Sequence, residues 1–281
     1  MAGGSCLSKP VEERVAVAVV ALFLATRFEA RGLVLPVALL GTLAVILVAI
    51  AVWGFQKIAG IPVGDHPIWI ETGALLAAVA IFLRFRTPIL VFPVAVTLWL
   101  TGMELATMLV AADVGPGDPE AQSVRRWFSV ASGLVILALA FWADLRSRSA
   151  RDHAFWLYLA GLGAFWGGLT AMDSSALAGK LVYVAVNCGL VLVGAALVQR
   201  VFTIFGAVGV AIGLAAIGDR FLRDSWLFPV ALTFIGLGVV GFGLWWSRNE
   251  ARLSTRLQAH LPPGLRAAIA SRREAARELA P

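Results

Sequence analysis

The stretch LVLPVALLGTLAVILVAIAVWGF, residues 33–55, decides the fold of this chain. It contains no charged residue, and as an α-helix it would extend about 34 Å at a rise of 1.5 Å per residue. This length exceeds the roughly 30 Å of hydrocarbon in a lipid bilayer. Residues 33–55 are therefore predicted to form a transmembrane helix.

Similar stretches fill most of the chain, which has 281 residues, 60% hydrophobic and only 14% charged. Further spans are predicted at 68–83, 88–112, 127–143, 154–171, 180–199, 201–217 and 226–247. The predicted fold class is all-α: a polytopic transmembrane helix bundle of eight spans, or nine if residues 15–26 also cross. Those residues give only about 18 Å of helix, so an interfacial or partial span is favoured over a full span with snorkelling arginines.

The chain divides into a short apolar segment (1–32), the transmembrane bundle (33–247) and a basic tail (248–281). Its 20 Arg and 3 Lys concentrate in alternate loops and in the tail, and this predicts that the arginine-rich side and the C-terminus are cytoplasmic. Basic residues in this pattern record membrane orientation, so nucleic acid is not an expected partner. Pro262-Pro263-Gly264 splits the tail into two short amphipathic segments, which we expect to lie on the lipid bilayer.

Polar residues inside the predicted spans are few, and each is costly to place in lipid. Glu104 lies about 12 Å from the outer end of its span, and its spacing from Thr97 and Thr101 puts the three side chains on one helix face. Asn187 lies at nearly the same depth in the span 180–199, and Glu71 enters shallowly from the same side. These five residues form the candidate intramembrane polar site.

Two interpretations of this site stay open. In the first, Glu104 titrates in a proton- or cation-responsive site, which would suit a small-solute or proton-coupled transporter. In the second, a neutral Glu104 bonds Asn187 or Thr101 and joins two helices, a contact of about 0.6–2 kcal/mol. The second is favoured, because transporters usually place several charges or a broken helix near the membrane midplane.

Enzyme chemistry is not expected. The sequence has no nucleotide-binding loop and no zinc motif, and the topology places His66 and His153 on opposite sides of the membrane. No cofactor or metal is therefore expected. Two glycine pairs, Gly163 with Gly167 and Gly209 with Gly213, predict close helix packing. The favoured role is a structural or assembly-type membrane subunit, with membrane-protein partners or a second copy of the chain.

Five motifs in the C-terminal half carry a resemblance: DHAFWLYL (152–159), AFWGGL (164–169), VFTIFGAVGV (201–210), FLRDSWLFP (221–229) and LPPGLR (261–266). Residues 151–266 resemble a family of uncharacterised multi-pass bacterial inner-membrane proteins. The resemblance implies a bacterial inner-membrane location. It implies no activity and no catalytic residue.

Overall fold

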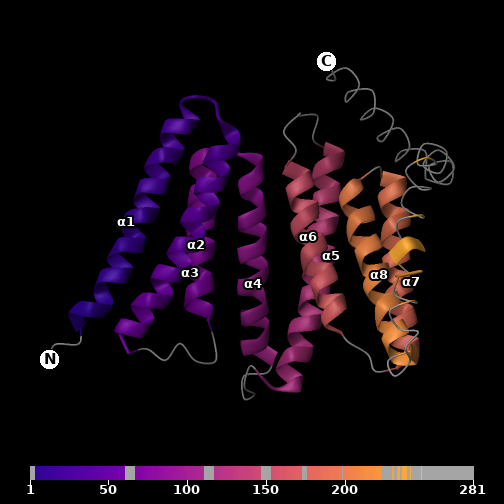
Figure 1. The fold of residues 1–281 in the computed structure, drawn as a ribbon. Helices are drawn as coiled ribbons and strands as arrows, with labels where there is room; N and C mark the ends of the chain where they lie inside the picture. Colours follow the sequence, from indigo (N-terminus) through magenta and orange to yellow (C-terminus); the bar gives the residue numbers. More distant parts are fainter. Residues whose placement is uncertain are drawn as a thin grey trace. The chain divides into compact units, whose positions relative to one another are not determined.

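The computed structural model describes residues 4–60, 67–110, 117–146, 153–172, 176–197 and 199–222, with short helical pieces at 230, 233–234, 236–238, 241 and 248. Within these ranges the chain is helical and contains no strand. The helices are α1 (Gly4–Glu29), α2 (Val34–Ile58), α3 (Ile68–Phe85), the short 3-10 helix η1 (Pro88–Leu90), α4 (Val91–Val110), α5 (Pro119–Arg146), α6 (His153–Ala171), α7 (Leu177–Leu197) and α8 (Arg200–Leu222) (Figure 1).

Seven helices in the described ranges are long and apolar enough to cross a membrane: α2, α3, α4 together with η1, and α5 to α8. The all-α prediction is confirmed, and the helices indicate a multi-pass membrane protein. The predicted eighth span, 226–247, and the tail beyond residue 248 lie largely outside the described residues. The count of eight or nine spans therefore stays a prediction.

Two helices begin at least eight residues earlier than the sequence predicts. Helix α1 has 26 residues, from Gly4 to Glu29, where only residues 15–26 were predicted as an apolar segment. Helix α5 begins at Pro119, although its span was predicted to begin at residue 127. Proline suits the first helical position and Glu120 suits the positive end of the helix dipole, so the polar turns of α5 are helical despite their low hydropathy.

The chain forms two compact units, Met1–Gly168 and Leu169–Pro281. Figure 1 shows the long helices of each unit running side by side. In the first unit, α1 packs on α2 through the buried face of Ala18, Ala21 and Ala25. A core between α1, α2, α3 and η1 continues from Ala25 to Leu90.

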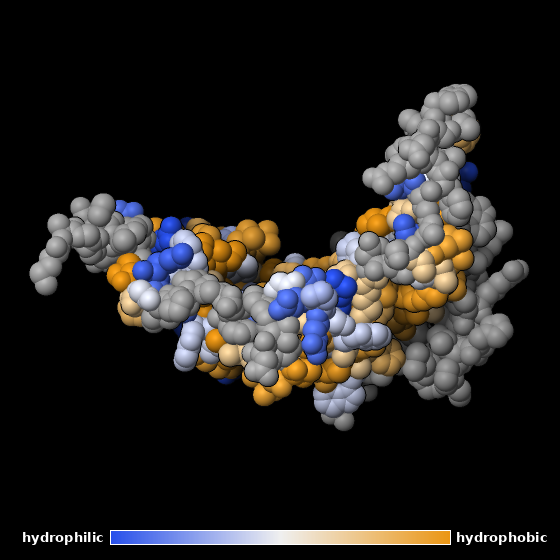
Figure 2. Space-filling model, turned by 90° about the horizontal axis from the view of Figure 1, so that it is seen from below, coloured by the Kyte–Doolittle hydropathy of each residue, from blue (hydrophilic) through white to orange (hydrophobic). Residues whose placement is uncertain are grey.

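Alanine is the commonest buried apolar residue in the described part of the first unit, and many large apolar side chains are exposed. Alanines such as Ala38, Ala44 and Ala140 are fully buried, whereas Leu76 and Leu109 are more than 60% exposed. Figure 2 looks onto the lower helix ends and shows hydrophobic residues (orange) broadly exposed, with hydrophilic residues (blue) gathered in small groups. Lipid solvates large apolar side chains well, and small residues let helix backbones approach closely.

The described connections between helices in the first unit include three left-handed residues, Gly32, Gly60 and Arg86. Gly32, with φ of 71°, follows α1, where the Leu33 N–H bonds the Phe28 carbonyl at 3.1 Å. This pattern is a Schellman motif, which usually takes glycine. Arg86 ends α3 with φ of 47°, a conformation that costs a side-chain-bearing residue about 1–2 kcal/mol.

Candidate intramembrane polar site

Glu104 lies on α4, six residues before that helix ends, and its side chain is only 4% exposed. Its Oε1 forms an ion pair with the guanidinium Nη2 of Arg125 on α5. Arg125 lies six residues after the first residue of α5, and its side chain is 28% exposed. The pair therefore joins the last turns of α4 to the first turns of the next helix.

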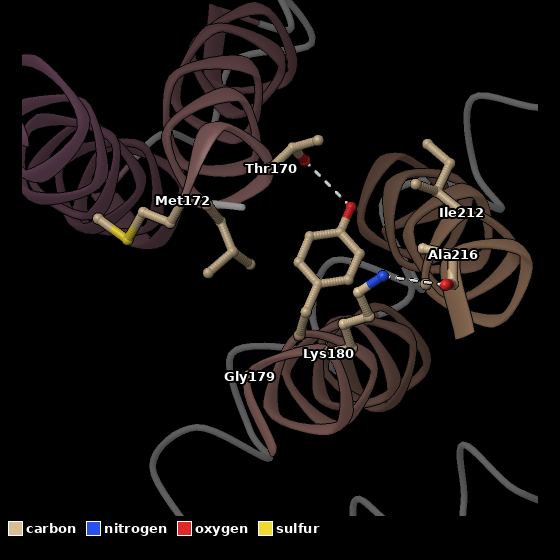
Figure 3. Close-up of a pocket in the computed structure, with 9 residues that line it drawn as sticks. Thr170, Met172, Gly179, Lys180, Ile212 and Ala216 are labelled. Atoms are coloured by element: carbon tan, nitrogen blue, oxygen red, sulfur yellow. Dashed lines mark hydrogen bonds between the residues drawn. The ribbon is translucent and has the colours of Figure 1, made fainter. Parts of the chain in front are cut away.

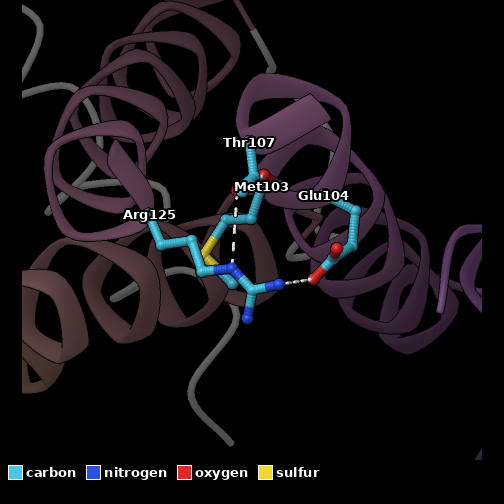
Figure 4. A network of polar contacts seen from close by, with 4 residues as sticks. All are labelled: Met103, Glu104, Thr107 and Arg125. Carbon is cyan, nitrogen blue, oxygen red and sulfur yellow. Dashed lines mark hydrogen bonds and ion pairs between the residues drawn. The ribbon is translucent and has the colours of Figure 1, made fainter. Parts of the chain in front are cut away.

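Arg125 is held at a second point on α4. Its Nε donates to Oγ1 of Thr107 at 3.4 Å, and Thr107 Oγ1 donates to the carbonyl oxygen of Met103 at 2.8 Å. Thr107 is fully buried. Figure 4 shows the guanidinium of Arg125 between the carboxylate of Glu104 and the hydroxyl of Thr107. The planar guanidinium thus bonds two positions that lie almost one turn apart on a single face of α4.

Glu71, in the first turn of α3, is an ionisable group within electrostatic reach of Glu104 and Arg125. Repulsion from Glu104 and attraction to Arg125 both act on its carboxylate. Its Oε2 is buried and accepts no hydrogen bond from the described part of the chain. The three helices α3, α4 and α5 therefore each contribute one ionisable side chain, and only Glu104 forms an ion pair with Arg125 among the described residues.

The two predicted threonines use their hydroxyl protons within α4. Thr97 Oγ1 donates to the carbonyl oxygen of Pro93 at 2.8 Å, and Thr101 Oγ1 donates to that of Thr97 at 2.9 Å. A threonine hydroxyl has one proton to donate. Thr97 and Thr101 therefore cap backbone carbonyls of their own helix, and their hydroxyls are left only to accept hydrogen bonds from elsewhere.

Asn187 belongs to the second unit, on α7, and is fully buried. Its Nδ2 donates to the carbonyl oxygen of Tyr183 at 2.8 Å, and its carboxamide packs against Gly209 of α8, where a Cβ atom would overlap it. The predicted close approach at Gly209 and Gly213 is confirmed. The packing of α7 on α8 accounts for the burial of Asn187.

The other predicted glycine pair is wrong in its register. A Cβ atom at Gly163 or Gly167 would meet no described atom within 4 Å. Helix α6 approaches α5 closely at Gly161 and Gly168 instead, where a Cβ atom would lie 3.1 Å from Leu137 N and 2.9 Å from the carbonyl oxygen of Arg126. The two contacting glycines are seven residues apart, so they share a face of α6 across two turns.

A second polar link of the first unit lies at Ser129 on α5, which the sequence analysis did not include. Ser129 Oγ donates to the carbonyl oxygen of Ala164 on α6 at 2.7 Å and accepts from Nε1 of Trp99 on α4 at 3.2 Å. One buried hydroxyl therefore connects α4, α5 and α6.

Arg125 and Thr107 were also outside the predicted site. Arg125 was assigned to a loop, because the span 127–143 was bounded by hydropathy alone. The sequence does hold a signal for it: Pro119-Glu120 is a helix start, and it places Arg125 inside the helix. In the described residues, no group of three or more His, Cys, Asp or Glu side chains is placed to hold a metal ion.

No family model matches the chain, and neither a curated protein nor a solved structure matches it. The resemblance of residues 151–266 to bacterial inner-membrane proteins therefore stays a prediction.

Proposed function

We propose that this chain is a non-enzymatic, structural or assembly-type membrane protein in which the Glu104–Arg125 ion pair stabilises the packing of α4 against α5. The supporting observation is that the most deeply buried carboxylate of the candidate site is bound by the next helix of the same chain. An ion pair enclosed in this way fixes the register of α4 against α5. Such a role for buried charges is known where they specify one packing arrangement over others.

Two experiments test the proposal: a proton-flux assay in liposomes, and a variant in which the two charged residues exchange positions. Purified protein in liposomes that contain a pH-sensitive dye should show no proton flux above protein-free liposomes under an imposed membrane potential. The charge-swapped variant Glu104→Arg/Arg125→Glu should fold, since the attraction is retained. A proton flux that Glu104→Gln abolishes, and that Arg126→Gln leaves unchanged, would overturn the structural role. Arg126 is a suitable control because its Nη2 bonds Gln122 of its own helix at 3.0 Å.

A proton-coupled transporter is the second candidate, and Glu71 is the observation in its favour. Glu71 interacts electrostatically with Glu104 and Arg125, so the cluster contains a second carboxylate that is not bound in a described ion pair. In this case Glu71→Gln and Glu104→Gln should each abolish proton flux in the same liposomes. Flux that survives both substitutions would exclude a transport role for this cluster.

We also propose a bacterial inner-membrane location, with eight spans and a cytoplasmic C-terminus. The exposed turn after α1 carries Arg31, and α8 opens with Arg200; both are on the predicted cytoplasmic side. The test uses single cysteines at Arg31→Cys and Glu120→Cys, with Cys6 and Cys188 replaced. A membrane-impermeant maleimide added to intact cells should label position 120 and spare position 31. The reverse pattern would invert the proposed orientation.

A further inference from the structure

The second unit contains a cavity of about 80 Å³, which no part of the proposed function uses. It lies where α6 ends, α7 begins and α8 approaches its last turns. Its polar lining consists of Thr170, Lys180 and Tyr183, and apolar side chains such as Leu169, Met172 and Ile212 form other parts of the wall. Figure 3 shows Thr170 and Lys180 reaching toward the cavity from different helices.

The polar groups offer hydrogen-bond donors and one positive charge. Lys180 Nζ donates to the carbonyl oxygen of Ala216 at 3.0 Å, which uses one of the three ammonium protons. The hydroxyls of Thr170 and Tyr183 lie 3.0 Å apart and share one hydrogen bond, so one of their two protons is left to donate. None of the nine residues lining the cavity is acidic. This lining suits an oxyanion with a single negative charge.

The cavity lies at the level expected for lipid headgroups. Lys180 is the fourth residue of α7, and Thr170 is the second-last residue of α6, so both are near the ends of candidate membrane spans. Lysine and tyrosine side chains are well suited to this interfacial region, where one end of each is apolar and the other is polar. A ligand held here would have its charged group at the membrane surface.

An apolar stripe leads away from the cavity along α8. Ile212 lines the cavity, and Val208 and Ile204 follow at intervals of four residues, so the three side chains share one helix face. All three are exposed, from 41% at Ile212 to 60% at Ile204. The stripe is about 12 Å long by helical rise, which matches a substantial part of an acyl chain.

We propose that this cavity binds a phospholipid. Its phosphodiester carries the single negative charge that Lys180 balances, and its oxygens accept hydrogen bonds from Lys180 and from the Thr170–Tyr183 hydroxyl pair. One acyl chain lies along Ile212, Val208 and Ile204. The adjoining apolar stripe favours a phospholipid over free phosphate, because free phosphate has no acyl chain to pack against it.

The test is native mass spectrometry of delipidated protein in detergent, titrated with phosphatidylglycerol. Lys180→Gln should weaken binding of the first lipid about tenfold or more, because a charge-assisted hydrogen bond is lost. Lys57→Gln is the matched control. Lys57 lies in the last turn of α2, on the same predicted side, and its Nζ is 5.7 Å from the ring centroid of Trp53. This control should bind as the wild type does.

Two further probes separate the sources of phosphate. Neither inorganic phosphate nor glycerophosphoglycerol, which lacks acyl chains, should displace the lipid at millimolar concentration. Tyr183→Phe, which keeps the aromatic ring, should weaken binding less than Lys180→Gln and supplies a second measurement if the lysine variant fails to fold. Equal binding by wild type and a folded Lys180→Gln would overturn the proposal. So would equal losses in both lysine variants, or displacement by either soluble probe.

Discussion

Arg125→Leu is expected to destabilise the first unit more than any other single change in the charged cluster. It leaves the carboxylate of Glu104, 4% exposed, in the helix interface without its guanidinium. Breaking a buried ion pair by removing one member costs about 3–5 kcal/mol. Because Arg125 is itself 28% exposed and its Nε–Thr107 bond is long at 3.4 Å, we expect the lower end, about 3 kcal/mol.

The reciprocal change is expected to cost less. In Glu104→Gln the amide oxygen can still accept from Arg125, and the partly exposed guanidinium can reach the headgroup region by snorkelling. We therefore expect a loss of about 1 kcal/mol. The double variant Glu104→Gln/Arg125→Leu removes both charges of the ion pair, so neither is left without the other. It should be more stable than Arg125→Leu alone, with a coupling energy of about 2 kcal/mol.

The assay is reversible unfolding of the purified protein in mixed micelles with increasing sodium dodecyl sulfate, followed by helical circular dichroism. Arg126→Leu controls for loss of a positive charge from the same turn of α5, and its effect should stay within about 0.5 kcal/mol. Equal losses for the two single variants, or additive losses in the double variant, would refute the reasoning. Additive losses would mean that the two side chains have no energetic coupling.

The same unfolding assay checks three other expectations. Gly209→Leu should lower the free energy of unfolding by about 1–3 kcal/mol, because the leucine side chain would overlap the carboxamide of Asn187 on α7. Gly189→Ala is the control and should not lower it, because a Cβ atom there meets nothing within 4 Å. Ser129→Ala should lower the free energy of unfolding by about 1–2 kcal/mol and shift tryptophan fluorescence. Ser132→Ala should have neither effect, because the Ser132 hydroxyl bonds a carbonyl oxygen of its own helix at 3.1 Å. Arg86→Gly should stabilise the protein by about 0.5 kcal/mol, because glycine adopts the left-handed conformation without strain. A loss of stability there would show that the arginine side chain matters more than its backbone.

Sequence patterns predicted the helices well because the cost of exposing backbone to lipid leaves few alternatives. Their ends were harder to place. The first turns of α5 are polar, so hydropathy alone does not place Arg125 inside a helix. The burial of Glu104 follows from its position in an apolar span, but its partner lies on another helix, 21 residues away in sequence. Which faces meet depends on the rotation of each helix, and one-dimensional periodicity does not fix that rotation. The same limit explains why the sequence predicts close contacts at Gly163 and Gly167, whereas the structure has them at Gly161 and Gly168.

In the first unit, many buried residues are alanines and many large apolar residues are exposed, so an alanine scan is less informative than usual. Replacing an exposed leucine such as Leu76 by alanine removes contacts mainly with lipid, so an alanine scan would report little across most of the surface. At the buried positions the native residue is often alanine already, as at Ala38 and Ala140, and such a scan passes over them. The informative series for this protein enlarges side chains. A leucine scan of its alanines would map the helix contacts, and natural variation should be permissive in residue size on the outer faces and strict on the inner ones.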